Sequence, residues 1–168
     1  MLFPRPKIIT PDIAAEASFA YDEDDRLYFS GGVAGGYGLV MTSNKVTPQF
    51  LTGLLNSSLL DWYFKPGAAR FQEGYFLYES RFLRNQPIET YYDEKDNPKE
   101  IAVEIVSIVR QVMEAKKSLH AEGDSVLLAR MVDHVQELER NLDNLVLALY
   151  GITQDEVKLV KEGPWYKG

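Results

Sequence analysis

The chain has 168 residues, of which 45% are hydrophobic and 26% charged, and it carries a formal net charge of −7 with a pI near 4.9. This composition suits one globular domain, or one small domain with an appendage, and the absence of an apolar run of about eighteen residues excludes a membrane-spanning helix. The acidic balance excludes tight nucleic-acid binding through net charge alone, so such a role needs a local basic surface or a second domain.

The chain contains no cysteine, which excludes disulfides and thiolate metal sites and fits the reducing environment of the cytoplasm. Both histidines, His120 and His134, fall in helical patterns, where a packed or solvated imidazole is commoner than a metal ligand. The first residues lack the basic region and apolar stretch of a signal peptide. We therefore expect a cytoplasmic protein without a metal site.

The N-terminal stretch predicts short strands joined by turns. Residues 7–10 form a strand candidate that ends at Pro11, whereas residues 12–20 fit either a helical turn or an irregular strand. The acidic run 22–25 predicts a turn that leads into a strand over 26–29. Four consecutive carboxylates can bind a hard cation, but a solvated loop tip is the commoner arrangement.

Five glycines lie within the eight positions 31–38, and aromatic residues flank them. The pattern predicts a strand, a tight glycine loop and a second strand over 39–41. A phosphate-binding loop would need a following Gly-Lys-Ser or Gly-Lys-Thr, which the sequence lacks. We therefore interpret the segment as a hairpin, and a small-molecule enzyme built on this loop is the least favoured function.

A single helix is predicted over 48–64, because Thr47 suits the N-cap, Pro48 suits the first helical position, and apolar residues follow at helical spacing. The segment 65–88 that comes next is basic and aromatic in an otherwise acidic chain. Its cations are Lys65, Arg70, Arg81 and Arg84, and its interleaved aromatic residues are Tyr75, Phe76, Tyr78 and Phe82.

This composition of the segment 65–88 allows two interpretations. Guanidinium groups beside exposed aromatic rings suit phosphate contact, guanine recognition and base stacking. The alternative is an ordinary amphipathic strand over 74–78, with arginine side chains whose stems lie along the surface.

The chain changes character after residue 92, where the charged linker 93–96 begins. Apolar residues then alternate spacings of three and four in two long stretches, which predicts two helices in an antiparallel, coiled-coil-like hairpin. The predicted helix signals are the capping box Asn97-Pro98-Lys99-Glu100, the stop at Gly123, the N-cap Asp124, the stop at Gly151 and a second capping box, Thr153-Gln154-Asp155-Glu156. The predicted fold class is α+β, with a mixed-sheet domain at 1–92 and a helical hairpin with a short terminal helix at 93–168.

Three motifs in the first half follow one another in a specific order. They are Tyr-Phe-Ser-Gly-Gly-Val-Ala-Gly-Gly-Tyr-Gly at 28–38, Leu-Thr-Gly-Leu-Leu-Asn-Ser-Ser-Leu-Leu-Asp-Trp-Tyr at 51–63, and Gly-Tyr-Phe-Leu-Tyr-Glu-Ser-Arg-Phe-Leu at 74–83, with Pro87-Ile88 after them. Over about residues 5–90 this succession resembles the TaqI-like C-terminal specificity domain. That domain is the target-recognition part of restriction-modification adenine methyltransferases. The run 143–156 also resembles the helical end that follows recognition domains in single-chain (type IIG) restriction-methylation enzymes.

The resemblance implies a domain that holds double-stranded DNA against a methyltransferase domain or subunit and reads bases in the major groove. From residue chemistry, Lys65 and Arg70 are expected to contact phosphates. The residues expected to approach base edges or to stack are Arg81, Arg84, Tyr75 and Tyr78, with Tyr37 projecting from the glycine loop.

No catalytic residue is expected within the chain. The Asn/Asp-Pro-Pro-Tyr/Phe signature of amine methylation is absent, and its nearest string, Asn97-Pro98-Lys99-Glu100, reads as a helix cap. S-adenosylmethionine is therefore expected in the methyltransferase domain and not here. A second hypothesis makes the chain a protein-interaction or dimerisation module without direct DNA binding. Under it, the apolar seam of the hairpin pairs with another helical partner or with a second copy in a homodimer.

Overall fold

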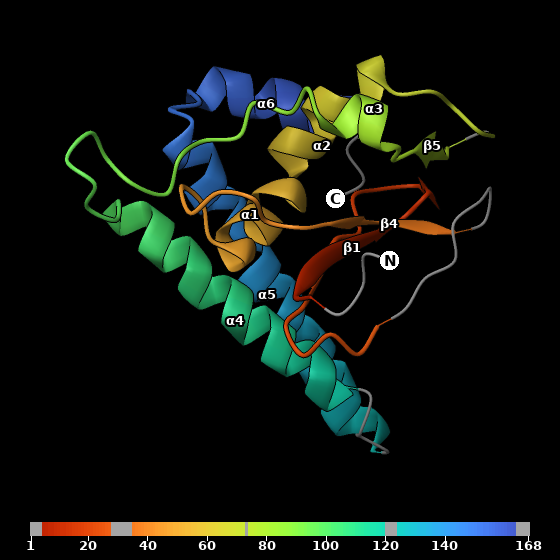
Figure 1. Cartoon of the computed structure of the whole chain (residues 1–168). Coiled ribbons are helices and arrows are strands. Elements are labelled where there is room, and N and C mark those ends of the chain that lie inside the picture. Colours follow the sequence, from red (N-terminus) through yellow and green to blue (C-terminus); the bar gives the residue numbers. More distant parts are fainter. Residues whose placement is uncertain (1–4, 28–34, 73, 120–123, 164–168) are drawn as a thin grey trace.

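The structure, a computed structural model, describes residues 5–27, 35–72, 74–119 and 124–163. It confirms the α+β class, with small sheets beside a larger helical part (Figure 1). The strands are β1 Lys7–Pro11, β2 Ile13–Ala14, β3 Ala20–Asp22, β4 Gly36–Leu39 and β5 Phe76–Leu77. The helices are α1 Pro48–Leu55, α2 Ser58–Phe64, the 3-10 turn η1 Lys65–Gly67, α3 Ser80–Leu83, α4 Glu100–Leu119, α5 Ser125–Leu149 and α6 Gln154–Glu162.

The described strands pair only antiparallel, so the sheets are not mixed as predicted. One sheet has the order β3-β1-β4 and the other pairs β2 with β5. The central strand β1 confirms the strand predicted at 7–10. Of the strand predicted over 26–29, Arg26 and Leu27 lie outside any strand. Residues 28–34, which hold most of the predicted glycine loop, lie outside the described residues.

The helix predicted over 48–64 is two helices. The predicted N-cap Thr47 is confirmed, since its side chain accepts from Phe50 N–H. The break falls at Asn56 and Ser57, and Ser57 caps α2 by accepting from Leu60 N–H. The Asn56 side chain bonds the backbone of Phe19. Its Oδ1 accepts from Phe19 N–H at 2.8 Å, and its Nδ2 donates to the Phe19 carbonyl at 2.7 Å. Asparagine and serine side chains compete with helical backbone bonds in this way, so the break ties α1 and α2 to the N-terminal strands.

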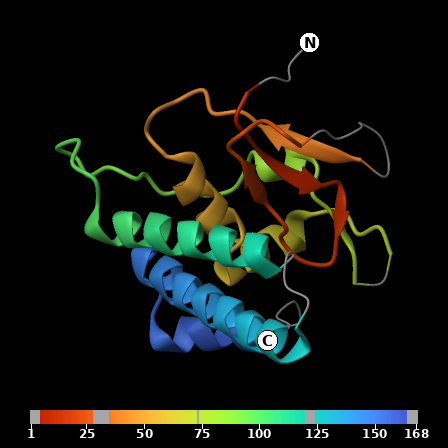
Figure 2. The ribbon, with the colours of Figure 1, turned by 90° about the horizontal axis from the view of Figure 1, so that it is seen from below.

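Helices α4 and α5 lie side by side as the predicted hairpin (Figures 1 and 2). The N-cap at Asp124 and the capping box of Thr153 with Glu156 are confirmed. The predicted cap at Asn97 is wrong, because α4 begins at Glu100 and Pro98 instead forms a β-bridge with Tyr92.

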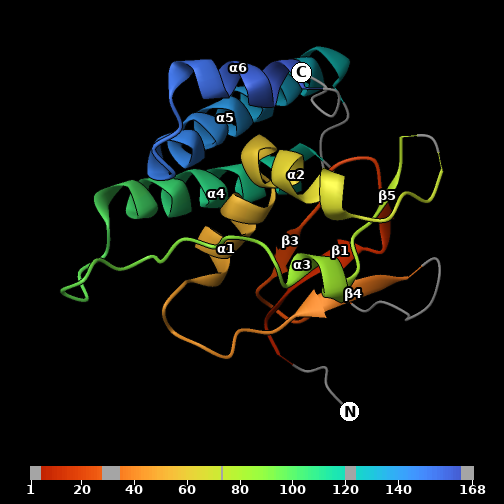
Figure 3. The same cartoon turned by 90° about the horizontal axis from the view of Figure 1, so that it is seen from above.

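One apolar core joins α1 and α2 to the hairpin. Figure 3 shows α1 and α2 between the strands and the helices α4, α5 and α6. The buried members of this core are Phe50, Leu54, Leu59, Leu60, Ala102, Ile105, Val109, Leu142, Val146, Leu147 and Val160. Gly53 marks a close approach of α1 to α4, since a Cβ there would lie 2.8 Å from a methyl carbon of Val109 and 3.0 Å from one of Ile105. The core therefore runs across residue 92, the predicted domain boundary.

A second core lies between the sheets and α1 and α2. Its buried members are Ile8, Phe19, Leu55, Phe64, Phe76 and Tyr78. Tyr78 stacks on Phe64 with ring centroids 4.6 Å apart and meets the edge of Phe19 at 6.1 Å. This core fixes the short strand β5, and with it the segment 70–84, against the rest of the molecule.

Asp143 of α5 makes a polar link to the start of α2. Its Oδ1 accepts a hydrogen bond of 2.8 Å from Ser58 N–H. Burial raises the pKa of the Asp143 carboxyl above its ordinary value, although the hydrogen bond from Ser58 opposes the shift. Because the folded state then binds this proton more tightly than the unfolded chain, stability falls as the pH rises from about 4 through the folded pKa.

We expect Asp143→Asn to remove that pH-dependent loss of stability. Asparagine keeps an oxygen that accepts from Ser58 N–H, but it does not titrate. The melting temperature of the variant should therefore gain on the wild type as the pH rises from about 4 to 8. Thermal melts followed by circular dichroism at several pH values measure this difference, and a difference that stays constant with pH would contradict it.

Candidate nucleic-acid interface

Asp12 brings the glycine segment and the basic-aromatic segment together. Its N–H donates to the carbonyl of Gly35 at 3.0 Å, and its carbonyl accepts from Tyr78 N–H at 2.8 Å. On one side of Asp12, Pro11 pairs with Gly36 of β4, and on the other side β2 pairs with β5. Two segments that lie about forty residues apart therefore meet through the backbone of one residue, in a stretch whose sequence fits either a helical turn or an irregular strand.

Residues 70–72 and 74–76 face each other as the two arms of a short β-hairpin at the end of the second sheet. Arg70 bridges to Phe76, and Phe71 N–H donates to the carbonyl of Tyr75. The side chains of Phe71 and Tyr75 are 47% and 48% exposed, and Arg70 is exposed as well. Two half-exposed rings beside a guanidinium are the arrangement that suits stacking on bases and contact with a phosphate backbone.

Helix α3 supplies the other two arginines. Arg81 lies within this four-residue helix and Arg84 is its C-cap, with Arg84 Nε donating to the carbonyl of Ser80 at 3.4 Å. Arg81 lies over the ring of Phe82, with 4.7 Å from Cζ to the ring centroid. Both arginines are exposed, so α3 presents two cations directly after β5.

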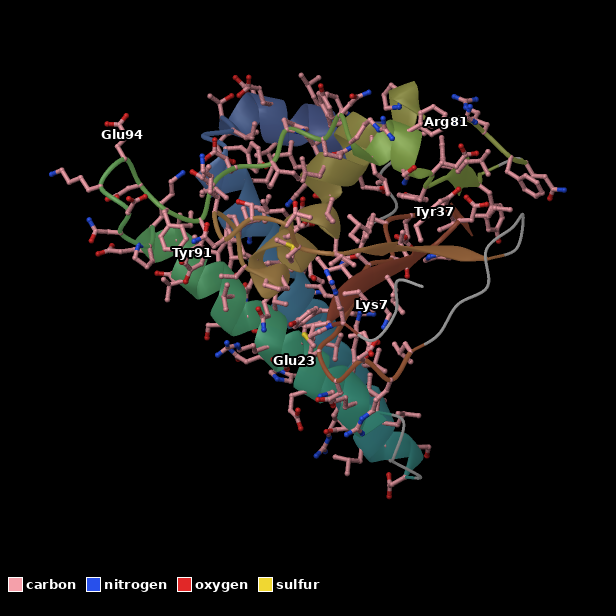
Figure 4. The ribbon with its side chains drawn as sticks, in the orientation of Figure 1. Lys7, Glu23, Tyr37, Arg81, Tyr91 and Glu94 are labelled. Carbon is pink, nitrogen blue, oxygen red and sulfur yellow. The ribbon has the colours of Figure 1, made fainter. Side chains whose placement is uncertain are left out.

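Tyr37 belongs to the same neighbourhood. It lies on β4 opposite Thr10 of β1, and Figure 4 shows it on the same side of the molecule as Arg81, away from Glu94. Burial raises the pKa of Tyr37, the charges of Asp12 and Glu79 raise it further, and Arg81 opposes them. We name Tyr37, Arg70, Tyr75, Arg81 and Arg84 the arginine–aromatic surface.

Two carboxylates lie beside this surface, and the sequence pattern predicts a role for neither of them. Glu79 pairs with Arg81, with 2.5 Å between Oε2 and Nε. Asp12 is only 8% exposed, and burial, together with the charge of Glu79, raises the pKa of its carboxyl. The sequence does indicate Glu79 as a neighbour of Arg81, because Glu79 lies two residues before it. Asp12 lies far from both in the sequence, and only the fold brings it near them.

The structure removes two residues from the predicted contacts. Lys65 is buried, and its Nζ lies 2.5 Å from Asp61 Oδ2 and 5.5 Å from the centre of the Phe76 ring. Tyr78 is 1% exposed and donates its hydroxyl to Asp61 Oδ1 at 2.5 Å. Burial, with the charge of Asp61, raises the pKa of Tyr78 far above its ordinary value. We therefore correct both residues from DNA contacts to supports of the second core.

Lys7 anchors the turn that leads into the glycine segment. Its buried ammonium lies 2.8 Å from Asp22 Oδ2 and 2.5 Å from Asp25 Oδ1. Asp22 also accepts from the N–H groups of Arg26 and Leu27. Burial alone would raise the pKa of Asp22, but these hydrogen bonds and the charge of Lys7 outweigh burial and lower it. Two carboxylates of the acidic run thus bind a lysine, which the sequence pattern did not indicate.

Across the described ranges there is no grouping of three or more His, Cys, Asp or Glu side chains placed to hold a metal ion. Within the same ranges, no helix combines the length and the apolar character that a membrane crossing needs.

Comparison with known families agrees with the motif order of the first half. A family profile described as the TaqI-like C-terminal specificity domain matches residues 1–88, just over half of the 168 residues. The match contains the whole arginine–aromatic surface. A search of curated proteins found no match. A specificity domain is the DNA-recognition part of a restriction-modification system and is not catalytic by itself. The chain therefore belongs to the family of TaqI-like C-terminal specificity domains.

Proposed function

We propose that this chain recognises double-stranded DNA for an adenine-specific methyltransferase, or for a combined methyltransferase and endonuclease of type IIG. The catalytic domain, with its S-adenosylmethionine, would be supplied by another part of the enzyme or by a separate subunit. The cytoplasm is the proposed location, because the chain has no cysteine and so needs no oxidising compartment to form disulfides. The observation that carries the proposal is the hydrogen bonding of Asp12 to both Gly35 and Tyr78, which joins the glycine segment to the part of the chain that holds the exposed arginines.

The residues of the arginine–aromatic surface divide by chemistry. Arg70 is an exposed cation near the end of the second sheet, and Arg84 is an exposed cation at the C-terminal end of α3. Each can bind a phosphate, and such contacts fix the position of the duplex. Tyr75, half exposed at the hairpin, suits stacking or contact with a base. Arg81 pairs with Glu79, and the charges of Asp12 and Glu79 raise the pKa of Tyr37, so Arg81 and Tyr37 lie beside acceptors and suit reading of base edges.

The net charge of −7 sets the expected strength of binding. A few local cations on an acidic chain give weak, strongly salt-dependent binding, because the rest of the protein repels the phosphate backbone. Tight binding is therefore expected only with the methyltransferase part, which would close on the opposite side of the duplex, and this chain alone is expected to select its sequence weakly and at low salt.

The salt dependence of binding to duplex DNA of random sequence tests the proposal. Each phosphate contact contributes about 0.9 to the slope of log K against log salt, so Arg70→Ala with Arg84→Ala should lower that slope by about 2 and weaken binding at low salt. Arg130→Ala with Arg140→Ala removes the same charge from exposed positions of α5 and serves as the control. A change of equal size in the control, or no binding by the wild type at low salt, would contradict DNA recognition by this surface.

A specific observation favours a second candidate, a homodimer through the hairpin. The first half of α5 exposes apolar side chains, namely Val126, Leu127, Leu128 and Val132 at 63%, 45%, 36% and 39%. Exposed apolar side chains at successive turns of a helix suit pairing with a second copy. Light scattering across a concentration series, run beside the binding measurement, separates the two functions, since a dimer without DNA binding would support this candidate alone.

A further inference from the structure

Glu79 and Arg81 form an accessible pair that offers both hydrogen-bond acceptors and donors. Arg81 Nε lies 2.5 Å from Glu79 Oε2, and Arg81 Nη2 donates to Oε1 at 3.2 Å. The side chain of Arg81 is 63% exposed and that of Glu79 is 23% exposed. The two residues are separated by Ser80 alone, at the start of α3, so both side chains come from one turn of the backbone.

A second carboxylate makes Arg81 hard to remove from this place. Asp12 is 8% exposed, and its Oδ1 accepts no hydrogen bond from any described residue. Burial and the charge of Glu79 raise the pKa of the Asp12 carboxyl. Burial and the charges of Asp12 and Glu79 raise the pKa of Tyr37, and the charge of Arg81 lowers it. If Arg81 turned to an outside acceptor, Glu79 would lose its partner beside a buried acid. Glu79 is only 23% exposed, so water replaces a lost partner incompletely, and a ligand that takes Arg81 binds best when it also gives Glu79 a donor.

This preference selects among the parts of DNA. A phosphate presents only acceptors, so it can take Arg81 but leaves Glu79 facing negative charge. The major-groove edge of a G·C pair presents both, since guanine N7 and O6 accept and the N4 amino group of cytosine donates. Arginine binds a carboxylate and the guanine edge with the same two-pronged geometry, so Arg81 can exchange Glu79 for guanine without a new side-chain shape.

On the basis of the DNA recognition proposed above, we propose that Glu79 and Arg81 together read one G·C base pair in the major groove. Arg81 donates to guanine O6 and N7, and Glu79 accepts from the cytosine amino group. Glu79 is then a specificity-determining residue with two effects. It strengthens binding to a base pair whose edge offers a donor. At every other sequence it weakens the attraction of Arg81 for phosphates.

Selection from a pool of randomised duplex DNA tests this with the full chain. The retained DNA is sequenced for the wild type, for Glu79→Gln and for Glu139→Gln. Glu139 pairs with Lys116 at 2.6 Å on the hairpin, so its variant breaks an exposed ion pair far from α3 by the same chemical change. The wild type and Glu139→Gln should enrich G·C at one shared position. Glutamine keeps an oxygen that can accept from the cytosine amino group but loses the charge that strengthens this bond. Glu79→Gln should therefore weaken that preference by about tenfold and bind unselected DNA more tightly at low salt.

Arg81→Lys gives a second, independent readout. Lysine keeps the charge but lacks the planar fork, so the variant should retain binding to unselected DNA and lose the guanine preference at that position. Enrichment of the same sequence by the wild type and Glu79→Gln, or a wild-type motif without a fixed G·C pair, would overturn the inference and leave DNA recognition standing. A wild-type chain that retains no DNA at any salt concentration would overturn the proposed function, and the inference with it.

Discussion

Replacing Phe50 with alanine should lower the free energy of unfolding by about 3–5 kcal/mol, a large part of the total for a domain of this size. Phe50 of α1 is fully buried in the core that joins α1 and α2 to α4, α5 and α6, and its ring meets the edge of Tyr91 at 5.5 Å. The cavity left by the ring would lie between the family domain and the hairpin, so both parts should lose stability together. Urea unfolding followed by circular dichroism measures the loss.

The matched control for Phe50→Ala is Phe71→Ala, which deletes the same group from a ring that is 47% exposed. Surface changes of this kind alter stability by about 0.5 kcal/mol or less. A single unfolding transition in the wild type and in Phe50→Ala would agree with one shared core. Two transitions, with a hairpin that unfolds independently of Phe50, would contradict it and would support separate folding of residues 1–92 and 93–168.

Replacing Gly36 with alanine should disturb the recognition region itself. A Cβ at Gly36 would lie 2.6 Å from the carbonyl oxygen of Thr10, which belongs to the backbone of β1 and cannot move aside cheaply. β1 and β4 would separate where Thr10 pairs with Tyr37, and the hydrogen bond between Asp12 and Gly35 would weaken. We expect a loss of about 1–3 kcal/mol in stability, as for overpacked cores, together with weaker binding to duplex DNA.

Gly67→Ala is the control for Gly36→Ala, because a Cβ at Gly67 would meet no atom within 4 Å. Melting temperature and binding to duplex DNA at low salt should both be close to the wild type in this control. If Gly36→Ala also has the melting temperature and the DNA binding of the wild type, the close approach of β1 and β4 does not hold the recognition region in place.

Local signals in the sequence predicted much of the helical part. The caps at Thr47, Asp124 and Thr153 depend on one side chain and the next few N–H groups, so they can be read without knowledge of the fold. The alternation of apolar residues likewise predicted the hairpin, because each helix must bury one face. Asn97 shows the limit, since the Tyr92–Pro98 bridge competes with the cap and α4 begins later.

The sheet and the site depend on contacts between distant residues, which local patterns do not contain. β4 pairs with β1, about thirty residues away. Lys65 was predicted to face DNA from its charge alone, but Asp61, one helical turn earlier, gives its ammonium a buried partner. Asp12 and Glu79 were not predicted as site residues because their proximity depends on how the first strands pack against β5 and α3.

Photo-crosslinking to duplex DNA tests most directly whether the arginine–aromatic surface binds DNA. A benzophenone amino acid is placed at Tyr75, which is 48% exposed, and separately at Val126, which is 63% exposed at the N-terminal end of α5. Figure 1 shows that end of α5 far from β5. If this surface binds DNA, position 75 should form a covalent adduct with labelled duplex that disappears at high salt, and position 126 should form none above background. Equal adducts at both positions, or an adduct at position 126 alone, would contradict it.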